Sequence, residues 1–182
     1  MKFYKLIIIF LVTLVMVSCK KDDNGDDGEE YALSAANFIG DYEQNYLQNL
    51  ISETVVFSNG TTSTSTTTTL GDIFQDVIYQ MQSNGIFTAN GLLTTNQIIV
   101  SADGETTMND GVIIDLELSG TYALNVPNSV LTIIYDDEEG IQVTKLYDIT
   151  VYTETEMRME YEISVTSGDI TTTTFEEIRF IR

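Results

Sequence analysis

The chain is strongly acidic and contains no histidine: of its 182 residues, 28 are Asp or Glu and 8 are Lys or Arg, a formal net charge of −20. Because phosphate binding needs a basic face, this charge argues against nucleic acid as a partner. The missing histidine removes the commonest general base and the commonest transition-metal ligand. Catalytic sites built on histidine are therefore excluded, and we expect neither an enzyme nor a cofactor.

The N-terminal residues have the pattern of a removable export signal. Lys2 and Lys5 precede an apolar run, residues 6–17, that is too short to span a membrane comfortably. Met-Val-Ser-Cys follows and resembles a bacterial lipobox. This resemblance implies that residues 1–18 are a lipoprotein signal peptide and that Cys19 becomes an acylated N-terminus. Cys19 is the only cysteine, so we expect no disulfide.

An acidic, polar segment separates Cys19 from the rest of the chain. Residues 20–30 contain no apolar side chain, so residues 19–33 are predicted to be a flexible tether. The start of the segment resembles the export signal of Bacteroidetes-type surface lipoproteins. The residues that carry this resemblance are Lys20, Lys21, Asp22 and Asp23. It implies a protein anchored by lipid in the outer membrane and facing the cell exterior.

Residues 34–182 are predicted to form one all-β domain. Dipeptides that favour hairpin turns recur along the chain, between segments rich in Thr, Val, Ile and Tyr. They are Asn59-Gly60, Asn84-Gly85, Asn90-Gly91, Asp103-Gly104, Asp110-Gly111, Glu139-Gly140 and Ser167-Gly168. This spacing is typical of an antiparallel meander. Residues 72–81 fit both a helix and a strand, and the hairpin turn that follows them favours a strand.

Alternation within the strands predicts which faces are buried. Met157, Met159, Tyr161, Ile163 and Val165 share one face, opposite a polar one. The first three are candidates for lining a cavity. The segment 130–135 is apolar on both faces, which predicts a strand that is covered on both sides or lies at a barrel seam.

Two polar patterns leave alternatives open. The nearly pure Ser/Thr stretches 61–69 and 171–174 fit a glycosylated, ice-binding or sugar-binding array, or simply exposed strands in which threonine is favoured. The acidic residues Asp136, Asp137, Glu138 and Glu139 occupy a predicted turn and are at most a weak Ca²⁺ candidate. Otherwise we expect no metal site.

Three short motifs resemble the lipocalin-like domains of Bacteroidetes-type lipoproteins. Phe-Ile-Gly-Asp-Tyr at 38–42 resembles the Gly-x-Trp opening of a first barrel strand, with Tyr42 in place of tryptophan. Gly-Thr-Tyr-Ala-Leu at 120–124, followed by 130–133, resembles the mid-domain hairpin, with Tyr122 in place of tryptophan. The last strand, with Arg179, resembles the basic-aromatic closing strand. The resemblance implies an up-and-down β-barrel of about 8 to 10 strands.

The resemblance also implies a binding module that holds a small apolar ligand. The alternative is a non-enzymatic accessory or adhesion-type surface lipoprotein that contacts a protein or a glycan. An enclosed apolar cavity of about 300 Å³ or more would favour the first. A filled barrel with an exposed apolar patch or an unpaired strand edge would favour the second.

Overall fold

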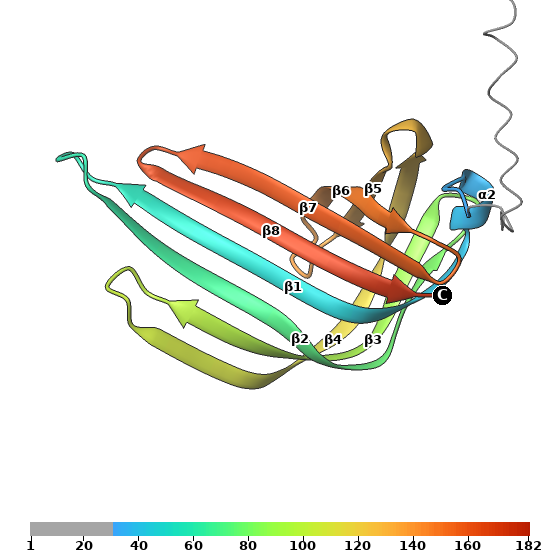
Figure 1. The fold of residues 1–182 in the computed structure, drawn as a ribbon, viewed down its shortest axis with the longest axis horizontal. Helices are drawn as coiled ribbons and strands as arrows, with labels where there is room; N and C mark the ends of the chain where they lie inside the picture. Colours follow the sequence, from blue (N-terminus) through green and yellow to red (C-terminus); the bar gives the residue numbers. More distant parts are fainter. Residues whose placement is uncertain (1–30) are drawn as a thin grey trace, which may run out of the picture. The chain divides into compact units, whose positions relative to one another are not determined.

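A computed structural model describes residues 31–182, which form a closed eight-stranded antiparallel β-barrel (Figure 1). Each strand pairs with its neighbour in the sequence, and β1 pairs with β8 to close the barrel. The elements are α2 (Ala35–Phe38), β1 (Gly40–Val56), β2 (Thr62–Met81), β3 (Ile86–Val100), β4 (Thr106–Asn125), a 3₁₀ turn (Val126–Asn128), β5 (Val130–Asp136), β6 (Gln142–Tyr152), β7 (Glu156–Ser167) and β8 (Ile170–Ile181). The predicted all-β meander barrel is confirmed.

The signal peptide, Cys19 and the sorting residues predicted from the sequence lie outside the described residues. Within residues 31–182, no helix has the length and apolar character needed to cross a membrane.

Most of the predicted turn dipeptides do lie at hairpin turns, but two of them do not. Asn90-Gly91 lies inside β3, and Asp110-Gly111 lies inside β4. A Cβ at Gly91 would come within 2.5 Å of the Asp76 carbonyl oxygen, so glycine is needed there for close strand packing. Gly111 has a φ of 72° beside a bulge in the β3–β4 ladder. Both glycines serve strand geometry instead of chain reversal, so the prediction of turns there is wrong.

Residues 72–81 form the second half of β2, as the following hairpin turn favours. Register shifts between Gly71 and Ile73 and between Gln75 and Ile78 interrupt the pairing of this segment with β3. Asp76, with a φ of 50°, lies within the second shift. Because each bulge moves the apolar residues out of strict alternation, the segment resembles a helical pattern although it is a strand.

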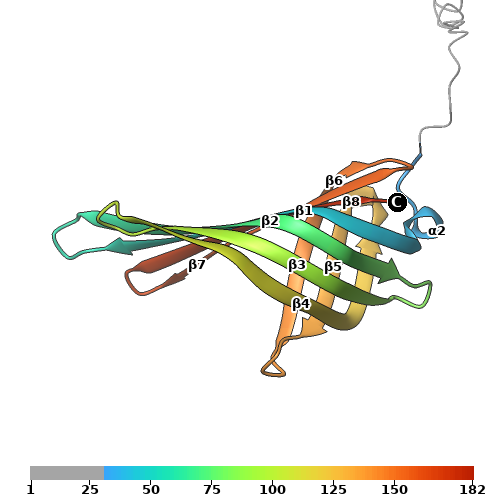
Figure 2. The same cartoon turned by 90° about the horizontal axis from the view of Figure 1, so that it is seen from below.

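Six of the strands continue beyond the closed barrel as an open sheet, the arm, which consists of residues 48–70, 96–115 and 162–175 (Figures 1 and 2). β5 pairs with β4 only over residues 120–125, and β6 pairs with β7 only as far as Glu160. Within the described residues, the stretches 106–119 of β4 and 161–167 of β7 are therefore unpaired sheet edges.

The core lies in the closed part of the barrel, and β7 shows where it ends. Met157 and Met159 are fully buried, as alternation predicted. Ile163 and Val165 share their face but are 42% and 54% exposed, so their predicted burial is wrong. They lie on the arm, beyond Glu160, the last residue of β7 that pairs with β6. The strand 130–135 has Leu131 and Ile133 buried against the core.

Candidate functional site

Aromatic side chains close one end of the barrel. Phe38 from α2 is fully buried, and its ring centroid lies 5.7 Å from that of Tyr42 and 5.6 Å from that of Tyr122. The Tyr42 hydroxyl donates to the Phe38 carbonyl at 2.7 Å, and burial raises the pKa of Tyr42. The Arg182 guanidinium lies 4.9 Å from the centre of the Tyr42 ring. In this plug, Tyr42 and Tyr122 occupy the two positions for which the resemblance implied tryptophan.

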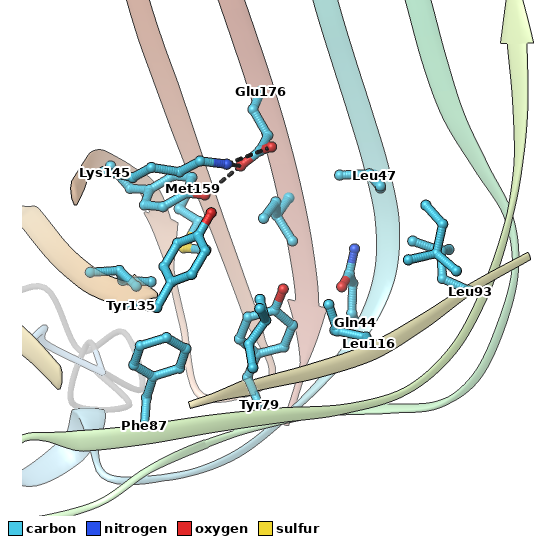
Figure 3. Close-up of a pocket in the computed structure, with 15 residues that line it drawn as sticks. Gln44, Leu47, Tyr79, Phe87, Leu93, Leu116, Tyr135, Lys145, Met159 and Glu176 are labelled. Carbon is cyan, nitrogen blue, oxygen red and sulfur yellow. Dashed lines mark hydrogen bonds and ion pairs between the residues drawn. The ribbon is translucent and has the colours of Figure 1, made fainter. Parts of the chain in front are cut away.

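A partly open cavity of about 170 Å³ lies inside the barrel (Figure 3). Its apolar lining includes Leu47, Phe87, Leu93, Leu116, Ile133 and Met159. Its polar lining consists of Gln44, Tyr79, Tyr135, Lys145, Tyr147 and Glu176. These residues come from β1 to β8 and meet only because the barrel closes. An apolar pocket with a few convergent polar groups is typical of a small-molecule site.

An ion pair is built into the wall of this cavity. The Lys145 Nζ lies 2.9 Å from Glu176 Oε1 and 3.0 Å from Glu176 Oε2 (Figure 3). The Tyr147 hydroxyl also donates to Oε1, and Asn49 Nδ2 donates to Oε2 at 3.3 Å. Glu176 is only 8% exposed. Four hydrogen bonds use the acceptor capacity of its carboxylate.

Two of the three residues that donate to this carboxylate are titratable, and their surroundings determine their protonation. Burial lowers the pKa of Lys145, but the charge and hydrogen bond of Glu176 outweigh burial, so the net pKa is raised. Burial, followed by the charge of Glu176, raises the pKa of Tyr147 well above its usual value. Near neutral pH, Lys145 is therefore an ammonium and Tyr147 a neutral phenol. The cluster is a preformed, electrically balanced group.

The three residues predicted to line a cavity have different positions in the structure. Met159 lines the cavity. Met157 is buried in the core but is not part of the lining. Tyr161 is not part of the lining either; it packs beside the ion pair, with its ring centroid 5.8 Å from that of Tyr147 and 5.6 Å from Lys145 Nζ.

Sequence reasoning missed the polar half of the lining, although two signals were present. Lys145 is the only lysine after Lys21. Glu176 alternates with the apolar residues Ile178 and Phe180 on its face of the last strand. A carboxylate on such a face and a single lysine in the domain are the expected signature of a buried ion pair.

The acidic residues proposed as a weak calcium candidate lie at the β5–β6 connection. The Asp137 carboxylate accepts the backbone N–H groups of Glu139 at 3.0 Å and Ile141 at 2.8 Å, so it stabilises the turn. Among residues 31–182, no group of three or more Asp, Glu, His or Cys side chains is placed to hold a metal ion.

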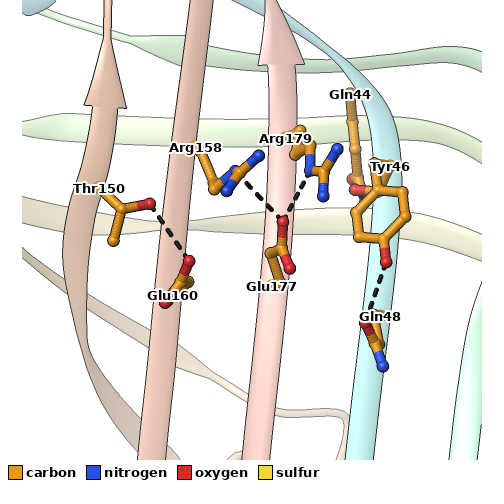
Figure 4. A network of polar contacts seen from close by, with 8 residues as sticks. All are labelled: Gln44, Tyr46, Gln48, Thr150, Arg158, Glu160, Glu177 and Arg179. Atoms are coloured by element: carbon orange, nitrogen blue, oxygen red, sulfur yellow. Dashed lines mark hydrogen bonds and ion pairs between the residues drawn. The ribbon is translucent and has the colours of Figure 1, made fainter.

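The outer face of the barrel carries a second polar network (Figure 4). Glu177 Oε1 accepts from Arg179 Nε at 2.7 Å and lies 3.3 Å from Arg158 Nε. The Arg179 guanidinium also lies 4.3 Å from the centre of the Tyr46 ring. Arg179, the basic residue noted in the closing strand, therefore stabilises the outside of the barrel. Arg182 is the arginine that lies over Tyr42.

The Ser/Thr-rich stretches lie on the arm, where their hydroxyl groups form pairs across neighbouring strands. Thr54 contacts Thr64 at 3.0 Å, and Thr166 contacts Thr171 at the same distance. The stretch 61–69 enters β2 and the stretch 171–174 lies in β8. The strand conformation expected from threonine is therefore present.

Comparisons of the chain with protein-family models, with curated proteins and with solved structures found no match.

Proposed function

We propose that this protein is a lipid-anchored, non-enzymatic binding module that holds a small, mostly apolar molecule in the barrel cavity. The observation that carries the proposal is the half-open cavity, with an apolar lining around the balanced Lys145–Glu176 pair. Its volume of about 170 Å³ is smaller than the 300 Å³ or more that would favour a ligand-binding barrel, so the cavity has room only for a small ligand. An engineered cavity of about 150 Å³ holds benzene, so the enclosed part of the ligand would be of that size.

Native mass spectrometry of the protein purified from its own host tests this proposal. A co-purifying small molecule that is lost when Met159→Trp fills the cavity supports it. The matched control is Met108→Trp, because Met108 is 61% exposed on the arm and its replacement leaves the cavity unchanged. A molecule retained by both variants, or the absence of any bound mass, would contradict cavity binding.

The anchor and the location are proposed from the sequence features around Cys19. Labelling with an alkyne fatty acid should be lost in Cys19→Ala, and equal labelling of the two proteins would refute acylation. Protease treatment of intact cells should digest the wild type. Protection of the Asp22→Ala/Asp23→Ala variant would support the acidic segment as a surface signal, whereas the same sensitivity in both would make it a plain linker.

The unpaired edge of β4 favours a second candidate function, the binding of an extended protein segment. Residues 106–119 present free backbone groups on this side within the described chain. Beside them lies a groove of about 450 Å³ whose acidic lining includes Asp115, Glu117 and Asp136. An exposed strand edge can pair with an extended segment of another protein, and the carboxylates beside it attract positive charge. The partner that suits this edge is therefore an extended basic segment.

Fluorescence anisotropy with a labelled peptide of alternating Lys and Val tests this candidate. Binding should exceed that of a Glu/Val peptide, weaken with salt and weaken in Asp115→Asn/Glu117→Gln. The control variant Glu160→Gln removes a carboxylate on β7 instead. Equal binding of both peptides would exclude the acidic edge as the site.

A further inference from the structure

Two polar side chains inside the cavity have unused hydrogen-bonding capacity. The Tyr79 side chain is 7% exposed, and its hydroxyl makes no hydrogen bond within residues 31–182. Gln44 is 2% exposed; its amide nitrogen makes one long bond, 3.4 Å to the Tyr46 carbonyl, and its amide oxygen makes none within the same residues. Both residues line the cavity (Figure 3). Neither the hydroxyl nor the amide oxygen is shut off from the cavity, so a bound molecule or water can reach both and make the missing hydrogen bonds.

The charged groups of the cavity are already occupied. Glu176 accepts four hydrogen bonds, two of them from Lys145 and one from Tyr147. A cationic ligand would meet the Lys145 ammonium without finding a free carboxylate oxygen. An anionic ligand would approach Lys145 only beside the Glu176 carboxylate, which repels it. Next to a carboxylate that is only 8% exposed, either arrangement is unfavourable.

We propose that the cavity selects an uncharged alcohol or phenol of about the size of one six-membered ring. The ligand hydroxyl would accept a hydrogen bond from Tyr79 and donate one to the Gln44 amide oxygen, while its ring packs against Phe87, Leu116 and Met159. This inference rests on the proposed binding function, and it adds the chemical class of the ligand. The unused donor and acceptor carry it, because they match one hydroxyl group.

Four probes with the same aromatic ring test the selection: toluene, benzyl alcohol, benzoate and benzylammonium. The whole protein, in a mild detergent, is labelled with ¹³C at its methionine methyl groups. The Met159 methyl reports occupancy of the cavity, and the exposed Met108 methyl reports adsorption to the surface. Benzyl alcohol should bind roughly threefold or more tightly than toluene, as expected for a net hydrogen bond. Benzoate and benzylammonium should bind at least about tenfold more weakly than benzyl alcohol.

Tyr79→Phe should bring the affinity for benzyl alcohol down to that for toluene and leave toluene binding unchanged. Tyr46→Phe is the control, because Tyr46 donates to Gln48 on the outer face. If toluene binds as well as benzyl alcohol, or if a charged probe binds best, the selection is refuted while cavity binding stands. If no probe shifts the NMR signal of the Met159 methyl group, both the selection and the proposed binding function are refuted. If Tyr79→Phe changes nothing, the hydroxyl is satisfied by water alone and the inference is wrong.

Discussion

Replacing Glu176 by leucine should destabilise the domain strongly, because it leaves the Lys145 ammonium without its partner. The Lys145 side chain is 21% exposed and Glu176 is 8% exposed, so water cannot fully replace the lost contact. Breaking a buried ion pair costs about 3 to 5 kcal/mol of the free energy of unfolding. Because Lys145 is partly exposed, we expect a loss at the lower end, about 3 kcal/mol. For a domain of this size, that corresponds to a fall in Tm of about 6 to 12 °C.

The matched variants separate the charge effect from loss of packing. Lys145→Met leaves Glu176 with its bonds from Tyr147 and Asn49, so we expect a smaller loss of about 1 to 2 kcal/mol. The double variant Lys145→Met/Glu176→Leu replaces the pair with apolar groups and should unfold within about 1 kcal/mol of the wild type. Glu162→Leu on the exposed arm is the control, with a change of about 0.5 kcal/mol or less.

Urea denaturation of the four variants and the wild type measures these free energies of unfolding. The reasoning requires a coupling energy of about 3 to 5 kcal/mol between the two positions. If the losses in the single variants simply add in the double variant, the two side chains do not depend on one another. The ion pair would then not be the feature that stabilises this wall of the cavity.

Three further perturbations follow from the packing and from the buried phenol. Gly120→Ala would place a Cβ 2.1 Å from a backbone oxygen of β5. Its Tm should fall by several degrees more than that of Gly111→Ala, whose Cβ meets nothing within 4 Å and which bears only the strain of a positive φ; similar melts would contradict the close approach. Met159→Glu should destabilise the domain by several kcal/mol and Glu160→Met by roughly 0.5 kcal/mol, and the reverse order in urea melts would mean that the faces of β7 are exchanged. Burial raises the pKa of Tyr147 well above 10.0, so the neutral phenol stabilises the folded state fully below pH 10, and this stabilisation is lost as the pH rises further. Urea melts from pH 8 to 11 should show a smaller loss of stability in Tyr147→Phe than in the wild type. The same pH profile in both proteins would contradict this prediction.

The sequence predicted the fold well because local patterns determine a meander. Turn dipeptides mark the hairpins, and alternation marks the buried face of β7 as far as Met159. The same patterns do not reveal how far a strand continues past its partner. Ile163 and Val165 alternate like core residues, yet the neighbouring strand β6 ends its pairing at Glu160 and leaves them on the arm.

The cavity was harder to predict because its polar groups come from distant strands. Gln44, Tyr79 and Glu176 become neighbours only when β1 pairs with both β2 and β8. Each of them on its own resembles an ordinary strand residue. The position of Met159 in the cavity could be predicted because it depends only on the alternation within one strand. Ion pairs and hydrogen-bonding groups that require the closure of a barrel lie beyond what the periodicity of single strands reveals.

The closing ladder between β1 and β8 also has a consequence for the order of folding. All other ladders join strands that are adjacent in the sequence, so each can form as a local hairpin. The β1–β8 ladder joins residues as far apart as Glu43 and Ile181 and must bring together the ends of the whole domain. Since contacts between distant residues carry the largest entropic cost, this ladder should form last on the folding pathway. Substitutions in β8 should then speed unfolding and leave the refolding rate nearly unchanged.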